Sequence, residues 1–270
     1  MRIYISVDAE GMPGIYTDDQ TSPKGSRYLE TRELMTDLTL FACEELHKKG
    51  VDEILLADSH DGMGNIFYER IPDYVSLIRG SRRPISMMYG IERKFDGALF
   101  LGYHAAAGSF HANFDHIYTY DFTEIRINDR RASEFYFNML VAGKYKVPVI
   151  LVAGDNVLEE DVKENAPWAQ YVRFKESITR HSNISPSLNT IKNQLKEKIK
   201  TAMDNLEKAK FIDLSPIRVV FKLKDTQAAD LAEIIPGLER IDAYSLVYSC
   251  ADAGLAYRMM EVIAHLTAVR

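Results

Sequence analysis

Four short apolar runs divide the first 155 residues of the chain, and we interpret them as buried strands. The runs are nearly continuous rather than alternating, which is typical of parallel strands covered by helices on both faces. They are Ile3–Val7, Ile54–Ala57, Ala98–Tyr103 and Val147–Ala153.

Segments with helical periodicity lie between these strands. From Tyr28 to Lys49 the apolar residues return once per helical turn, and Gly50 follows as the stop that often ends a helix. A second helical pattern, Ala132–Tyr145, precedes the fourth strand. Strands that alternate with helices predict a doubly wound α/β fold with a mainly parallel sheet.

The pattern changes after Asp155. Pro186–Lys210 is a polar helix with one apolar stripe, and two strand–helix units follow it. These units are Ile217–Leu223 with Thr226–Ile235, and Tyr244–Cys250 with Asp252–Val269. We therefore expect two domains: a main α/β domain over residues 1–180 and a smaller α+β domain over residues 181–270.

Composition narrows the classes of function. Of the 270 residues, 46% are hydrophobic and 27% charged, which is ordinary for a globular protein with a sizeable core. A formal net charge of −6 argues against a nucleic-acid partner, because such proteins usually carry a basic excess. The sequence has no run of 18 apolar residues and no signal-peptide pattern at its start, so we expect neither a membrane span nor secretion.

The chain has two cysteines, Cys43 and Cys250, too few for a disulfide framework or for a thiolate zinc site. We interpret both as small buried hydrophobic residues and expect a cytoplasmic location. Any metal ion would therefore be bound by carboxylates and imidazoles.

Acidic residues and histidines follow the predicted strands. Parallel strands present their carboxyl ends at one edge of the sheet, where ligands bind in this class of fold. Crowded carboxylates repel one another unless protons or cations neutralise them, and mixed carboxylate and imidazole ligands suit zinc, manganese or cobalt. The segments are Asp8-Ala9-Glu10-Gly11, Asp58-Ser59-His60-Asp61-Gly62, Gly102-Tyr103-His104 and Gly154-Asp155.

Each of these residues also has a structural interpretation. Asp8 could cap a turn, and His60 could lie in an exposed loop. His104 could be a hydrogen-bonded core histidine, and Glu134 could favour the dipole of the helix that begins there. Their shared position at one edge of the sheet favours a metal site.

The loop Gly108–Ile117 contributes two further histidines, His111 and His116. Either could act as an acid, a base or an oxyanion stabiliser beside a metal ion, and either could instead be solvated. We assign no role to the remaining histidines, His47, His181 and His265.

Several of these motifs, in this order, resemble the DppA-type D-aminopeptidases, a family of self-compartmentalising zinc peptidases. The resemblance covers the chain from residue 1 to the region of residue 180, and beyond that it is limited to general layout. The motifs are Ser6-Val7-Asp8-Ala9-Glu10-Gly11, Asp58-Ser59-His60, Gly102-Tyr103-His104, Asn128-Asp129-Arg130 ahead of Glu134, and Val152-Ala153-Gly154-Asp155.

The resemblance implies a dinuclear zinc site, with two zinc ions per subunit and Asp8 as the bridging ligand. It also implies that His116 is the catalytic histidine, with His111 as the alternative, and that the chain forms a homodecamer of two stacked five-membered rings. The implied zinc ligands are Asp8, Glu10, His60, His104 and Glu134.

We therefore expect residues 1–180 to be a metal-binding catalytic domain and residues 181–270 to contribute to oligomerisation. The expected activity is that of a zinc aminopeptidase acting on short peptides, with D-amino-acid-containing substrates implied by the family. Two alternatives are another metal-dependent amide or phosphate-ester hydrolase and a non-enzymatic metal-binding assembly protein. The pair His60 and His104 argues against a magnesium site, because magnesium prefers oxygen ligands.

Overall fold

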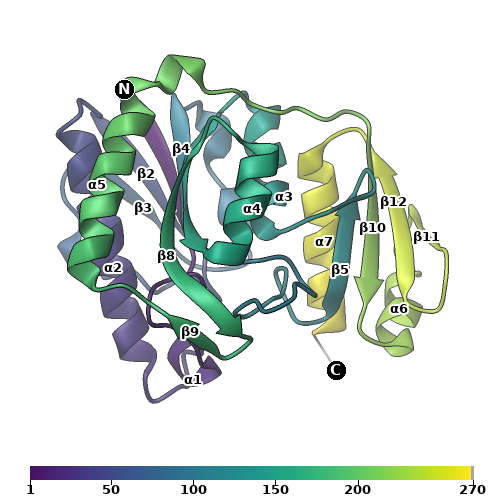
Figure 1. The fold of residues 1–270 in the computed structure, drawn as a ribbon. Coiled ribbons are helices and arrows are strands. Elements are labelled where there is room, and N and C mark those ends of the chain that lie inside the picture. Colours follow the sequence, from purple (N-terminus) through teal and green to yellow (C-terminus); the bar gives the residue numbers. More distant parts are fainter. Residues whose placement is uncertain (269–270) are drawn as a thin grey trace.

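The structure is a computed structural model that describes residues 1–268, and it contains two β-sheets (Figure 1). The larger sheet has seven strands in the order β3-β2-β1-β4-β7-β8-β9, parallel throughout except for the last pair. These strands are β1 Arg2–Val7, β2 Glu53–Asp58, β3 Val75–Ile78, β4 Gly97–Tyr103, β7 Val149–Asp155, β8 Gln170–Thr179 and β9 Ser182–Ile184.

The four strands predicted from the sequence are β2, β1, β4 and β7, which lie side by side at the centre of this sheet. The predicted α/β fold with a mainly parallel sheet is confirmed. The outer strands β3 and β8 were not predicted, because partly exposed strands interleave polar residues with apolar ones and lose the continuous apolar pattern.

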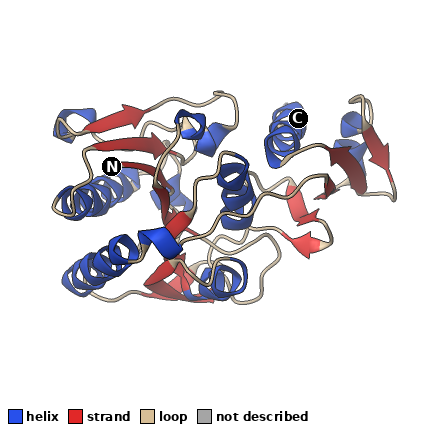
Figure 2. Cartoon of the chain, turned by 90° about the horizontal axis from the view of Figure 1, so that it is seen from above, coloured by secondary structure: helices blue, strands red, loops and turns tan. Residues whose placement is uncertain are grey.

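Helices cover both faces of the large sheet (Figure 2). On one face, α2 (Tyr28–His47) and α5 (Leu188–Asp204) contribute apolar side chains to the same core as Ile3, Ile5 and Val7. On the other face, α3 (Glu134–Lys144) packs beside α7 (Ala253–Thr267) in a core that contains Tyr4 and Phe100. The remaining helices are α1 Asp18–Thr21, α4 Asn156–Asn165 and α6 Thr226–Ala232. The predicted end of the last helix, Val269, lies outside the described residues.

The second sheet is antiparallel and has the strand order β11-β12-β10-β5-β6. Its apolar side chains join the core formed by α3 and α7, so the two sheets share one hydrophobic interior. Each sheet draws on residues from both sides of position 180, and the division into residues 1–180 and 181–270 stays a prediction. The strands are β5 Phe122–Ile127, β6 Arg130–Arg131, β10 Ile217–Leu223, β11 Leu238–Arg240 and β12 Ser245–Cys250.

The strand order of the large sheet reverses between β1 and β4, because β2 and β3 lie to one side of β1 while β4, β7 and β8 lie to the other. Ligands of doubly wound folds bind beyond the carboxyl ends of the strands at such a reversal. Two glycines let these ends approach closely. A Cβ atom on Gly11 would lie 1.8 Å from the carbonyl oxygen of Tyr103, and Gly102 has a φ of +72°. The Gly11 N–H donates to the Gly102 carbonyl at 2.8 Å.

The structure also shows the surroundings of the two cysteines and the character of the longer helices. Cys43 is buried as predicted, whereas Cys250 is only half-buried because it ends β12 at the border of the second sheet, and both thiols are free. Within residues 1–268, no helix combines the length and the apolar character needed to cross a bilayer.

Candidate metal centre

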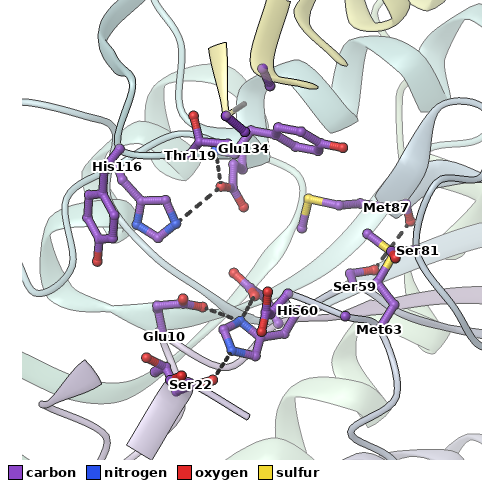
Figure 3. A pocket seen from close by; sticks show the side chains of 18 of the residues that line it. Glu10, Ser22, Ser59, His60, Met63, Ser81, Met87, His116, Thr119 and Glu134 are labelled. Atoms are coloured by element: carbon purple, nitrogen blue, oxygen red, sulfur yellow. Dashed lines mark hydrogen bonds and ion pairs between the residues drawn. The ribbon is translucent and has the colours of Figure 1, made fainter. Parts of the chain in front are cut away.

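The five residues predicted as metal ligands lie together in one buried cluster at the carboxyl edge of the large sheet. Figure 3 shows three of them, Glu10, His60 and Glu134. Asp8 and Glu10 follow β1, His60 follows β2 and His104 follows β4. Glu134 is the first residue of α3. None of the five is more than 6% exposed, which is unusual for charged side chains and requires compensation nearby.

Asp8 lies between the two histidines. One of its carboxylate oxygens is 3.4 Å from Nδ1 of His60, and the other is 3.7 Å from Nε2 of His104. Glu10 Oε2 is 2.9 Å from the same His60 nitrogen, and Glu134 Oε1 is 3.7 Å from the same His104 nitrogen. Asp8 therefore belongs to two groups of potential ligands, one with Glu10 and His60 and the other with His104 and Glu134.

Backbone carbonyl groups fix which nitrogen of each histidine faces the acids. Nε2 of His60 donates to the Thr21 carbonyl at 2.8 Å, and Nδ1 of His104 donates to the Ala105 carbonyl at 3.0 Å. In the neutral tautomers that these bonds select, the other nitrogen of each ring offers a lone pair to the cluster. This support from outside the cluster is the usual feature of metal-ligating histidines.

The cluster also contains polar atoms without hydrogen bonds. Among the described residues, Asp8 Oδ2 and His104 Nε2 are fully buried and have no hydrogen-bond partner. When neither atom carries a proton, two facing acceptors in a buried site repel each other, and leaving them unsatisfied costs roughly 1–3 kcal/mol each. A divalent cation between them would remove this cost, and the mixed oxygen and nitrogen donors suit zinc.

The pKa values of the cluster residues in the absence of a cation also favour a metal site. Burial and the neighbouring charge of Glu10 raise the pKa of Asp8 to about 8. Burial by itself would lower the pKa of His104, but the charges of Glu134 and Asp8 outweigh it and raise the pKa to about 10. Asp8 and His104 therefore retain protons that a bound metal ion would displace.

The loop that carries His60 is held by a second acid. Asp58 is fully buried and accepts hydrogen bonds from Nδ2 of Asn65 at 2.7 Å and from the Ile66 N–H at 2.9 Å. Asn65 Nδ2 also donates to the His60 carbonyl at 2.8 Å. Asp58 is thus part of the predicted motif but serves to fix the His60 loop. Asp155 likewise caps the N-terminus of α4, where its side chain accepts from the Val157 and Leu158 N–H groups.

The segment that carries Glu10 is a turn rather than an extended strand, closed by a hydrogen bond from the Met12 N–H to the Ala9 carbonyl. Lys175 of β8 fixes this turn. Its fully buried ammonium group donates to the Glu10 carbonyl and, at 2.7 Å, to the Ile15 carbonyl. Burial lowers the pKa of Lys175 to about 7. The sequence did not indicate this lysine, because it lies in an unpredicted strand.

The two loop histidines have different surroundings. His116 is stacked on His104, with ring centroids 4.4 Å apart, and its Nδ1 donates to the Phe114 carbonyl at 2.7 Å. Its Nε2 therefore faces the cluster, 4.0 Å from Glu134 Oε1. His111 is exposed, and its Nδ1 lies 3.1 Å from the Ile178 carbonyl, away from the cluster. Of the two, His116 is the one that the fold places beside the five predicted ligands.

A cavity of about 570 Å³ opens above the cluster, which is within the usual range of roughly 300–1,000 Å³ for small-molecule sites. Its walls include residues that the sequence did not single out, among them Tyr118, Tyr120 and Arg82. His265, to which no role was assigned, also lines it from the C-terminal end of α7. No sequence pattern connects these segments, because they meet only in the folded chain, where α7 packs against α3.

The chain matches the model of a known peptidase family. The family model described as D-aminopeptidase, peptidase family M55, matches residues 1–262. The chain belongs to the D-aminopeptidase family. A D-aminopeptidase of Bacillus subtilis (strain 168) is 33% identical over 270 residues, which cover 98% of this chain and 97% of that protein.

A solved structure extends the comparison to the fold. The Zn-dependent D-aminopeptidase DppA from Bacillus subtilis, described as a self-compartmentalizing protease, superposes with a TM-score of 0.95 at 31% identity. The match covers 98% of this chain and 97% of that chain, so it includes both sheets.

Proposed function

We propose that this member of the D-aminopeptidase family is a zinc-dependent aminopeptidase that removes the N-terminal residue from short peptides containing D-amino acids. Two zinc ions per subunit would be held by five side chains, with Asp8 shared between them. The observation that carries the proposal is the buried, mutually facing pair of Asp8 Oδ2 and His104 Nε2. The five ligands would be Asp8, Glu10, His60, His104 and Glu134.

Zinc supplies Lewis acidity at such a site, which polarises a peptide carbonyl and makes a water molecule a stronger nucleophile at neutral pH. The chain itself supplies the proton transfer. Because Nδ1 of His116 is committed to the Phe114 carbonyl, Nε2 is the nitrogen free to accept a proton and to return it to the leaving amine. We therefore assign the catalytic role to His116 rather than His111.

The acidic end of the cavity would orient the substrate. Asp18 and Asp61 line this cavity but are not among the proposed ligands, so their carboxylates remain available to a cationic group when the ligands hold zinc. The α-ammonium group of a peptide is such a group. Its binding next to the zinc ions would place the first peptide bond, rather than an internal one, at the reacting centre.

The assembly and the location are also part of the proposal. The structural relative is described as self-compartmentalizing, which supports a homo-oligomer with enclosed sites, and we propose a decamer to which residues 181–270 contribute. The two free thiols, Cys43 and Cys250, fit a reducing cytoplasm.

The test is a panel of matched dipeptides with D- or L-residues at the first position, assayed with zinc, manganese or cobalt. The proposal predicts metal-dependent release of the first residue and preference for a D-residue. Hydrolysis of phosphate esters in place of peptides would favour the alternative hydrolase, and metal binding without any turnover would favour a non-enzymatic assembly protein.

A further inference from the structure

Arg82 differs from every other charged residue that lines the cavity. Within the described part of the chain, the cavity wall contains several carboxylates but one permanently charged cation, the guanidinium group of Arg82. This side chain is exposed and makes no hydrogen bond or ion pair with any residue of the range 1–268. An arginine with five donors and no protein acceptor is available for a ligand.

The backbone around Arg82 is fixed by its neighbour. Arg83 is buried, and its guanidinium group donates to the carbonyl groups of Ser86 at 2.8 Å, Gly80 at 3.1 Å and Asp58 at 2.6 Å. This clamp ties the segment to the end of β2. Arg82 itself has a φ of +61°, a left-handed conformation that is costly for a residue with a side chain. Such strain persists where the surrounding structure enforces it, often at ligand sites.

The position of this segment relative to the metal cluster sets the direction of a bound molecule. Ser81 and Met63 lie across the cavity from Glu10 and His116 (Figure 3). Arg82 therefore lies on a segment across the cavity from the proposed zinc ions. A short peptide bound with its first residue at the zinc ions would extend its C-terminal carboxylate group away from them, towards this segment.

We propose that Arg82 is a specificity-determining residue that binds the C-terminal carboxylate group of the substrate. This inference rests on the proposed aminopeptidase function and narrows its substrates to peptides short enough to place both termini in one cavity. An arginine binds a carboxylate through two parallel N–H···O bonds, which a neutral amide cannot form.

The experiment compares two substrates that differ only at the C-terminus, a dipeptide of D-alanine as the free acid and the same dipeptide as the C-terminal amide. The zinc-loaded wild-type protein is expected to prefer the acid by about 10-fold to 100-fold in kcat/KM. In Arg82→Gln this preference disappears because turnover of the acid falls, mainly through KM, while turnover of the amide falls far less. Arg82→Lys retains part of the preference, since it keeps the charge without the paired geometry.

The matched control is Arg79→Gln. Arg79 is also an exposed arginine of this region, but it donates to the Gly64 carbonyl at 3.2 Å and does not line the cavity, so its variant keeps the wild-type preference. Equal hydrolysis of acid and amide by the wild type, or an equal loss of both in Arg82→Gln, overturns the role of Arg82 and leaves the aminopeptidase function standing. A wild-type protein that hydrolyses neither dipeptide overturns the proposed function, and this inference with it.

Discussion

Replacing Glu261 of α7 by glutamine is predicted to stabilise the protein, and to do so only above acidic pH. The Glu261 carboxylate is 9% exposed and accepts the Ile85 N–H at 3.1 Å, at the start of the segment that carries Met87 into the cavity wall. Glutamine keeps the shape and an acceptor oxygen. It removes a negative charge that the surroundings solvate poorly.

The expected gain in the free energy of unfolding follows from the titration of the Glu261 carboxyl group. Burial raises the pKa of Glu261 from 4.5 to about 7, so the folded state binds the proton more tightly than the unfolded state does. Below pH 4.5 this group is protonated in both states and does not affect the free energy of unfolding. Between pH 4.5 and 7 its ionisation lowers the free energy of unfolding, by up to about 3 kcal/mol at 1.36 kcal/mol per pKa unit. Glutamine introduces a buried NH2 group that the carboxyl group lacks, which costs about 1 kcal/mol and leaves a net gain of about 2 kcal/mol above pH 7.

Urea unfolding of the wild type and of Glu261→Gln, measured at pH 5 and pH 8, tests this value. The difference in the free energy of unfolding is expected to be about 2 kcal/mol in favour of the variant at pH 8 and close to zero at pH 5. Taking the difference cancels the titration of the metal cluster, which both proteins share. Glu197→Gln, at an exposed position of α5, is the control and changes stability little at either pH. A variant that is less stable at pH 8, or a gain that does not depend on pH, refutes the reasoning.

Two further predictions concern the metal centre. His116→Ala should keep its zinc content in metal analysis while kcat falls by about 10²-fold to 10⁴-fold, because it removes a proton-transfer group and not a ligand; loss of zinc would show instead that His116 is a ligand. Asn65→Ala removes the hydrogen bond to the His60 carbonyl, and competition with a chelator should show zinc affinity roughly 10-fold to 100-fold lower. Unchanged affinity would mean that Asn65 does not hold His60 in place.

The centre of the fold could be predicted because buried parallel strands are nearly continuous runs of apolar residues. The same regularity brings Asp8, His60 and His104 to one edge, since each lies within two residues of the end of a central strand. The role of an acid at that edge could not be predicted. Asp58 and Asp155 are the last residues of two other central strands, β2 and β7, yet their oxygens accept backbone N–H groups of the next loop or helix.

Residues that reach the site through long-range packing gave no signal in the sequence. Lys175 reaches the Glu10 turn from β8, a partly exposed strand without a continuous apolar pattern. Arg82 lies in a connecting segment, and His265 lies on the last helix, which packs against α3 and against β10 and β12 of the second sheet. Apolar periodicity predicts which face of a helix is buried, but it does not predict what that face meets.

The central claim is that five side chains hold a pair of zinc ions around Asp8. Anomalous diffraction at the zinc edge, from crystals of the zinc-loaded protein, tests it most directly. Two zinc peaks per subunit are expected beside the Asp8 carboxylate, one near His60 and one near His104, and both are expected to be lost in Asp8→Ala. Zinc peaks elsewhere, or a well-ordered cluster that binds none, would contradict it.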